Sequence, residues 1–260
     1  MSAGPALERS HFAGYNCAFI AVDHHRAFDE IMFILMCGTG MGFSVERKHV
    51  EQMAPVPSQI IDTAEVIEVA DSREGWATSY RTLIENLYSG YMPMWDVSKV
   101  RPFGARLSTF GGRASGPEPL EQLFQFTIDT FRGAVGRRLS PIEVHDLVCK
   151  IGDVVVSGGV RRSALISLSD LSNPEMAKAK SGAWWENNGQ RALANNSAVY
   201  TRRPSAEIFL HEWSALIESQ SGERGIFNLE GVRNASPDRR YGELIEGTNP
   251  CGEISLRSKG

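Results

Sequence analysis

The stretch Gly247-Thr248-Asn249-Pro250-Cys251-Gly252-Glu253-Ile254 lies almost at the end of the 260-residue chain. Pro250 has no backbone N–H and a fixed φ, and Gly252 allows backbone angles that a Cβ forbids. Together these two residues predict a loop and not a helix. The loop surrounds a cysteine, so the first question is what its neighbours could do with that thiol.

Asn249, Cys251 and Glu253 are spaced two residues apart. If the loop is extended, they lie on one face, because successive side chains of an extended chain point to opposite sides. A thiol, a neutral amide and a carboxylate on one face suit a sulfur-centred reaction on a substrate that carries hydroxyl groups. The alternative is a cysteine in a Pro/Gly turn with two solvated polar neighbours.

The octet resembles the radical loop of ribonucleotide reductases, with the residues that are typical of the adenosylcobalamin-dependent (class II) enzymes. Four more segments resemble blocks of the same family, in the same order along the chain. They are NCAFI at 16–20, GTGMGFSVE at 38–46, FGGRASGPEPL at 110–120 and GGVRRSA at 158–164. The resemblance covers residues 12–258 and identifies the chain as part of the large catalytic chain of this family.

The resemblance implies a fold. Reductases of this family form a ten-stranded α/β barrel, with the radical cysteine on a hairpin loop at the centre. We therefore expect an incomplete barrel in one partial catalytic domain over residues 1–260. Within it we expect a family-specific insertion at 47–105, effector-specificity loops and helices at 106–170, and the radical loop at 247–258.

Short apolar runs, glycine turns and amphipathic segments alternate along the chain, which independently predicts an α/β layered fold. An apolar run at 154–156 precedes a glycine-containing turn at 157–163. Residues 91–99 are predicted to be turn-rich. Strands are expected at 17–22, 43–45, 60–69, 164–168, 193–200 and 226–229. Helices are expected at 28–37, 74–88, from a cap at 115 or 116 to 132, at 140–152 and at 205–219.

Composition excludes several classes of protein. The net charge is −4, so no basic surface predicts nucleic-acid binding. The longest apolar run, at 31–37, is far shorter than the ~20 residues of a membrane helix. The four cysteines are widely spaced and do not resemble a secreted disulfide framework, which predicts a reducing cytoplasm. Cys37 and Cys149 are expected to be core thiols.

The resemblance assigns catalytic roles by matching residues. Cys251 forms the thiyl radical that abstracts the 3′ hydrogen of a ribonucleotide. Glu253 accepts the 3′-hydroxyl proton and so promotes loss of the 2′-hydroxyl as water, while Asn249 holds the ribose hydroxyls. Cys17 is one member of the reducing pair; from sequence context alone it would be a buried strand thiol.

Gly38, Gly40 and Gly42 form a glycine-dense turn before the second strand. By itself this pattern is weak evidence for nucleotide binding, and it indicates only that a backbone or a ligand approaches closely. The resemblance places the turn near the bound substrate, and we assign Asn16 to the same substrate site.

A second glycine turn combines flexible backbone donors with two guanidinium groups, which suits phosphate or base contacts. A solvated basic turn is the alternative. The resemblance makes it the loop through which a deoxynucleotide effector tunes substrate choice. Its residues are Ser157, Gly158, Gly159, Arg161, Arg162 and Ser163.

The resemblance also implies adenosylcobalamin as cofactor, a thioredoxin-type reductant, and deoxyribonucleotide synthesis for DNA replication, with diphosphate or triphosphate substrates left open. We assign no metal ligands. Most cobalamin contacts, the second reducing cysteine and the later barrel strands are expected in a missing C-terminal portion. The chain is thus expected to be a truncated, split or intein-interrupted reductase, inactive alone. The alternatives are a non-catalytic deoxynucleotide-binding fragment and a reductase whose radical comes from a diiron or dimanganese subunit.

Overall fold

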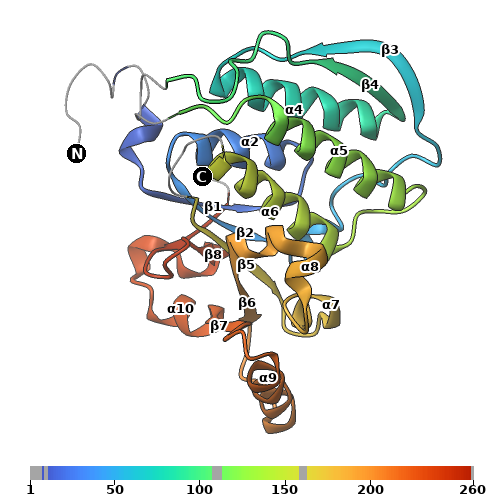
Figure 1. The fold of residues 1–260 in the computed structure, drawn as a ribbon. Helices are drawn as coiled ribbons and strands as arrows, with labels where there is room; N and C mark the ends of the chain where they lie inside the picture. The colour runs from blue at the N-terminus through green and yellow to red at the C-terminus, as the bar shows by residue number, and fades with distance from the viewer. Residues whose placement is uncertain (1–7, 9–10, 107–112, 158–162, 259–260) are drawn as a thin grey trace.

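The computed structural model describes residues 8, 11–106, 113–157 and 163–258, and its centre is a parallel five-stranded sheet (Figure 1). All four strand pairs are parallel, and β1 and β7 form the edges. Helices alternate with the strands, which confirms the α/β class expected from the sequence. In spatial order the strands are β1 (Cys17–Ala21), β2 (Gly40–Ser44), β5 (Leu165–Asp170), β6 (Ala194–Tyr200) and β7 (Gly225–Asn228).

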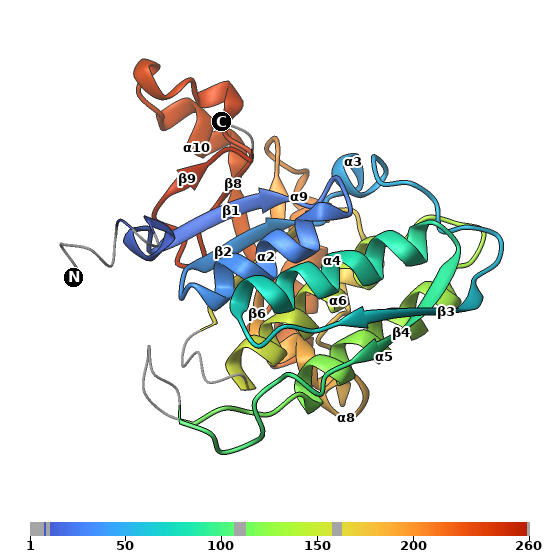
Figure 2. The same cartoon turned by 90° about the horizontal axis from the view of Figure 1, so that it is seen from above.

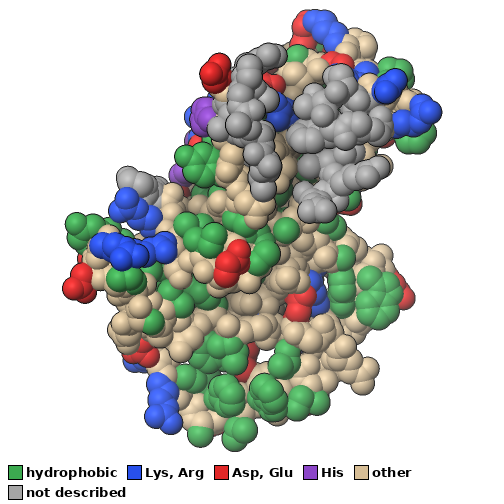
Figure 3. All heavy atoms as spheres, turned by 90° about the vertical axis from the view of Figure 1, so that its left-hand side faces the viewer, with side chains coloured by type: hydrophobic (Ala, Val, Ile, Leu, Met, Phe, Trp, Pro, Cys, Tyr) green, Lys and Arg blue, Asp and Glu red, His purple; other side chains and the backbone are tan. Residues whose placement is uncertain are grey.

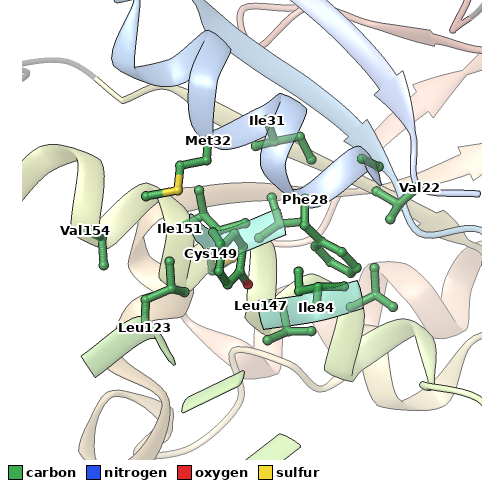
Figure 4. Packing of buried hydrophobic residues seen from close by; sticks show 14 of the residues in the cluster. Val22, Phe28, Ile31, Met32, Ile84, Leu123, Leu147, Cys149, Ile151 and Val154 are labelled. Carbon is green, nitrogen blue, oxygen red and sulfur yellow. The ribbon is translucent and has the colours of Figure 1, made fainter. Parts of the chain in front are cut away.

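Four long helices cover one face of this sheet (Figures 1 and 2). The first and the last of them in the chain pack directly against the strands, and the other two pack on these helices. One large hydrophobic cluster therefore joins all four helices to β1 and β2. Figure 4 shows Phe28, Ile31 and Met32 packing against Leu147 and Ile151 in this cluster. The helices are α2 (Arg26–Met36), α4 (Arg73–Tyr88), α5 (Glu118–Gly133) and α6 (Pro141–Ser157).

Polar contacts between these helices are few and specific. The buried Asp29 carboxylate on α2 accepts hydrogen bonds from Arg81 Nε at 2.9 Å and Nη2 at 2.6 Å on α4. The fully buried Tyr80 hydroxyl lies 3.1 Å from the Thr127 hydroxyl on α5. The Asp29 carboxylate and the Tyr80 hydroxyl thus both have partners, which avoids the cost of burying an unpaired polar group.

A second, two-stranded parallel sheet lies outside α4 and α5, formed by β3 (Ile61–Glu68) and β4 (Tyr91–Asp96), with α4 between them in sequence. The strand at β4 corrects the expectation that residues 91–99 are turn-rich. Pro93 lies within β4, but β4 pairs with β3 alone, and a strand with one free side tolerates a missing backbone donor.

Two other boundaries differ from the sequence prediction. Helix α6 continues to Ser157, so the apolar run 154–156 belongs to the last turns of the helix. Val154 and Val155 are buried there, which shows that tertiary packing extends the helix. Gly40 and Gly42 lie within strand β2 and not in a turn: Gly40 pairs with Cys17 of β1, and Gly42 pairs with Phe19 of β1 and Ile166 of β5.

The remaining elements connect the strands or cover the second face of the sheet. In the described ranges no helix is long and apolar enough to cross a membrane. The elements that connect the strands or cover the second face are η1 (His11–Gly14), α3 (Arg47–Val50), α7 (Pro174–Ala177), α8 (Trp184–Asn188), η2 (Gly189–Leu193), α9 (Ala206–Ser219), α10 (Leu229–Ala235), η3 (Asp238–Arg240), η4 (Gly242–Leu244), β8 (Gly247–Thr248) and β9 (Ser255–Leu256).

The second face carries a smaller cluster and a short hairpin. Because side chains alternate along a strand, Ile20 joins the large cluster whereas Phe19 points to the other side. Strands β8 and β9 pair antiparallel and form a hairpin over β1 and β2. The residues of the smaller cluster are Phe19, Leu168, Val199, Phe227, Leu229 and Ile245.

Glycines allow the hairpin to lie directly on the sheet. A Cβ added to Gly42 would stand 1.8 Å from the Thr248 carbonyl oxygen. A Cβ added to Gly247 would stand 2.1 Å from the Phe19 ring. Neither contact leaves room for a side chain, so glycine is required at both positions for the hairpin backbone to rest against β1 and β2.

We predict that Gly42→Ala lowers the free energy of unfolding by about 1–3 kcal/mol, because the new methyl group must push the Thr248 backbone away. Gly133→Ala is the matched control, since a Cβ there meets nothing within 4 Å. That variant is expected to be neutral or stabilising by up to ~1 kcal/mol. Urea unfolding of the two variants checks the prediction, and equal effects would contradict the close contact at Gly42.

A buried histidine couples stability to pH. His145 on α6 lies 2.9 Å from the Ser167 hydroxyl through Nδ1 and 3.5 Å from the Cys149 sulfur through Nε2. Burial, together with the positive charges of Arg191 and Lys180, lowers the pKa of His145 to about 3. The ring is therefore neutral in the folded protein at every pH at which the protein is handled.

The unfolded chain binds a proton on His145 near pH 6.5 and the folded protein does not. This contribution to stability is complete above that pH and is lost as the pH falls toward the folded pKa of about 3. Between pH 7.5 and 5.0 the loss is about 2 kcal/mol. We predict that urea unfolding of His145→Phe shows a pH dependence smaller by that amount, although the variant is less stable throughout. Identical pH dependences would contradict a neutral buried ring.

Candidate active site

The loop between β8 and β9 is held in a tight turn. The Asn249 backbone N–H donates to the Ile254 carbonyl at 3.1 Å, and the Gly252 N–H donates to the Asn249 carbonyl at 3.0 Å. Gly252 has a φ of +84°, which a residue with a Cβ rarely adopts. The loop is thus turned and not extended, and the condition for a shared face of Asn249, Cys251 and Glu253 is not met.

Asn249 braces the loop from inside. Its side chain is fully buried, and Oδ1 accepts from the Ile254 N–H at 3.0 Å and from the Thr248 hydroxyl at 3.4 Å. Its Nδ2 is buried without a hydrogen-bond partner among the described residues. The amide oxygen therefore stabilises the hairpin through hydrogen bonds, whereas the amide nitrogen retains N–H groups that no described residue accepts.

Cys251 and Glu253 face outward. Both are exposed, whereas Pro250 between Asn249 and Cys251 is buried. The turn presents the thiol and the carboxylate at the tip of the hairpin, supported by a buried asparagine and a buried proline. The sulfur is accessible to a substrate or a cofactor, and the backbone beneath it is held by hydrogen bonds.

The tip rests at the end of the sheet where β1 and β2 begin. A Cβ on Gly40 would lie 3.0 Å from the Pro250 ring, and Gly40 pairs with Cys17 in the β1–β2 register. The hairpin thus carries Cys251 to the end of the sheet that holds Cys17. Cys17 is half-buried, and its sulfur accepts a hydrogen bond from Asn16 Nδ2 at 3.2 Å.

The predicted substrate residues surround the same end. The Gly40 N–H donates to the Asn16 carbonyl at 3.0 Å, and Gly38 turns the chain with a φ of +86° between α2 and β2. Gly42 lies under the hairpin at Thr248. The close approach at Gly40 and Gly42 is therefore made by the proline ring and the backbone of the hairpin itself, whereas a Cβ on Gly38 would meet nothing within 4 Å.

The predicted effector loop is only partly described. Gly158, Gly159, Arg161 and Arg162 lie outside the described residues. Ser157 is the exposed last residue of α6, and Ser163 lies two residues before β5. Next to Ser163, the Ala164 carbonyl accepts from the Met41 N–H at 2.9 Å, so the described end of this loop reaches β2 beside Gly40.

Sequence reasoning missed Thr248 and Ala164, whose backbones form this site. Both contribute carbonyl oxygens and no diagnostic side-chain chemistry, so the only available signal was the glycine spacing of the strand they approach. A cavity of about 650 Å³ lies elsewhere, at the other end of β2. It contains none of the predicted site residues and is lined by Arg47, Val50, Glu51, Pro55, Gly136, Arg137, Arg138, Leu139 and Pro141.

Buried charges gather at that opposite end as well. The buried Glu46 carboxylate accepts from the Ser44 hydroxyl at 2.9 Å and lies 3.7 Å from His49. Burial lowers the pKa of His49, and the nearby Lys48 charge lowers it further. The two ends of the sheet thus differ: the cysteine end carries thiols, amides and the exposed Glu253, and the other end carries the buried Glu46 carboxylate.

Comparisons with known proteins agree on one family. The model of the insertion domain of B12-dependent ribonucleotide reductases matches residues 44–130. The adenosylcobalamin-dependent ribonucleoside-triphosphate reductase of Lactobacillus helveticus is 31% identical over 279 residues, covering 85% of this chain and 35% of that protein. The enzyme of the same name from Lacticaseibacillus paracasei is 29% identical over 280 residues, covering 91% and 36%.

A solved structure supports the fold. The crystal structure of a B12-dependent (class II) ribonucleotide reductase superposes with a TM-score of 0.76 at 24% identity, covering 94% of this chain and 41% of that one. The chain spans about a third of the length of the curated relatives it matches. Because a family model, curated relatives and a solved fold agree, the chain belongs to the family of B12-dependent (class II) ribonucleotide reductases.

Proposed function

We propose that this chain carries the radical cysteine of a ribonucleotide reductase, which converts ribonucleotides to 2′-deoxyribonucleotides for DNA synthesis. The observation that supports the proposal is the position of the β8–β9 hairpin on the sheet. Its tip exposes Cys251 at the end of the sheet where Cys17 begins β1, so two thiols with different tasks are positioned by one pair of strands.

Cys251 is the hydrogen-abstracting residue. As a thiyl it takes the hydrogen atom from C3′ of the ribose, so that an S–H bond forms while the C3′–H bond breaks. Glu253, exposed at the same tip, accepts the 3′-hydroxyl proton, and the 2′-hydroxyl leaves as water after protonation. A return of the hydrogen atom to C3′ regenerates the thiyl.

Cys17 is one of two thiols that supply the reducing electrons. Two thiols become one disulfide for each 2′-hydroxyl lost as water, which balances the reaction, and the second thiol would come from the remaining part of the reductase. Asn16 donates its amide hydrogen to the Cys17 sulfur and so orients it. A thioredoxin-type reductant then restores the thiols.

Asn249 stabilises the hairpin and also donates a hydrogen bond to the ribose. Its Oδ1 is engaged in the hairpin, so Nδ2 is the atom left for a ribose hydroxyl. Because Nδ2 is enclosed, such a contact requires the tip of the loop to open when substrate binds.

The cofactor is proposed from the relatives, whose names state dependence on adenosylcobalamin. The exposed Cys251 thiol at the hairpin tip fits a cofactor that must reach the sulfur from outside the sheet. When bound, adenosylcobalamin supplies the radical that removes the hydrogen atom from that thiol. Contacts that hold the cofactor would come mostly from the remaining part of the reductase.

The relatives are named as triphosphate reductases, which favours ribonucleoside triphosphates as substrates. A deoxynucleotide effector would bind near Arg161 and Arg162. We also propose the subdivision into an insertion at 47–105, effector elements at 106–170 and the radical loop at 247–258.

The four thiols are predicted to differ in reactivity. Burial raises the pKa of Cys37 and Cys149, the latter strongly, whereas Cys251 is exposed and Cys17 is half-buried. With iodoacetamide at pH 8 and mass spectrometry, Cys251 is expected to react first and Cys17 next. Cys37 and Cys149 are expected to react only when urea unfolds the protein. Earlier labelling of Cys37 than of Cys251 would contradict the exposed tip.

The function itself is tested by adding a separately produced polypeptide that supplies the rest of the reductase, with adenosylcobalamin and a dithiol. Formation of deoxyCTP from CTP is expected with the wild-type chain and with the Cys37→Ala control, and CDP tests the diphosphate alternative. Cys251→Ala is expected to lower turnover by more than 1,000-fold, because no other group makes the radical. Equal activity of Cys251→Ala would disprove the radical role.

A further inference from the structure

Helix α9 presents its apolar side to solvent. At 100° per residue, six of its residues form one continuous apolar arc, and the structure buries none of the residues of α9. Figure 3 shows apolar side chains at the lower end of the molecule, at the level that α9 occupies in Figure 1. The arc consists of Ala206, Phe209, Leu210, Trp213, Leu216 and Ile217.

The helix is attached to the sheet by polar contacts on another side. Glu212, outside the arc, accepts from Arg224 Nε at 3.0 Å. Arg224 is buried and donates also to the Ser169 hydroxyl at 3.1 Å and to the Leu171 carbonyl at 2.6 Å. A surface helix normally turns its apolar stripe inward and its charges outward. Here a buried ion pair faces the protein and the apolar stripe faces water.

The exposed stripe is comparable in size to the largest apolar patch of a typical monomeric protein, and such patches are often functional. Phe209 is 39% exposed, Leu210 59%, Trp213 49% and Ile217 62%. At roughly 100 Å² for each of these side chains, the stripe presents about 400 Å² of apolar surface, which is in the range of functional patches. Its neighbour β7 is an edge strand, and Ile226 on that strand is 54% exposed. The next strand in the chain thus adds another exposed apolar side chain, at the edge of the sheet.

Two candidates for covering the stripe can be compared by the surface area that each would bury. A second copy of the chain packing stripe on stripe would bury about 800 Å² in total, below the ~1,200 Å² of a stable interface. The curated relatives contain roughly twice as much additional polypeptide as the matched part, since this chain covers 35% of their length. A segment of that size can cover the stripe and the β7 edge together.

We infer that the apolar face of α9 is the docking surface for the remaining part of the reductase polypeptide. The inference rests on the proposed function, because it identifies the partner as the rest of the same enzyme. The partner is expected to present an apolar groove to Phe209, Trp213 and Ile217. The buried Arg224–Glu212 pair holds the helix in place before docking.

The test uses Trp213→Glu, with Ser214→Glu as the matched control on the exposed polar side of the same helix. Circular dichroism first confirms that both variants keep their helix content. Titration calorimetry against the separately produced remainder of the reductase is expected to show binding at least 10-fold weaker for Trp213→Glu and unchanged for Ser214→Glu. Sedimentation of the chain alone is expected to show a monomer.

Equal affinity of the two variants would overturn the inference. So would a dimer of the chain alone that Trp213→Glu dissociates, because the occupant would then be a second copy. Failure of the proposed function is distinguishable: if Cys251→Ala retained turnover while Trp213→Glu still lost binding, the radical role would fail and the docking surface would stand. Loss of turnover by Trp213→Glu is expected to recover when the remainder is in excess.

Discussion

The contact between Gly42 and the Thr248 carbonyl is the constraint on which the candidate site depends. Strand β2 lies in the middle of a parallel ladder, so its backbone cannot move without breaking pairs with β1 and β5. The hairpin rests on that fixed backbone because no side chain stands between them. Thr248 is thereby held, Pro250 is set against Gly40, and the thiol that follows is carried to one end of the sheet.

The two faces of the sheet differ in how much apolar surface they bury and in which reactive groups they expose. The helices α2, α4, α5 and α6 bury the large cluster, in which even the histidine and the cysteine of α6 are enclosed and uncharged. The other face has a small cluster, a hairpin and an exposed thiol. Because the rigid face supplies most of the buried apolar surface, the hairpin face can remain partly open to a substrate.

The site was only partly predictable. The resemblance of the octet to a known family led to the proposal for Cys251, and the structure places Cys17 at the same end of the sheet. The orientation of Asn249 was not predictable, since the extended loop assumed for it is replaced by a turn whose tip the amide itself stabilises. Helix α9 was readily predicted as amphipathic, but its outward apolar face was not.

The sequence by itself determined the alternation of helices and strands, the glycines that permit close approach and the family to which the chain belongs. These properties depend on local conformation and on residue identity, which each residue carries wherever it lies. Only the tertiary structure decided which backbone approaches Gly42, which side chains of the hairpin face solvent and which side of α9 is left uncovered. Those outcomes depend on contacts between residues far apart in the chain, such as Thr248 with Gly42 and Glu212 with Arg224.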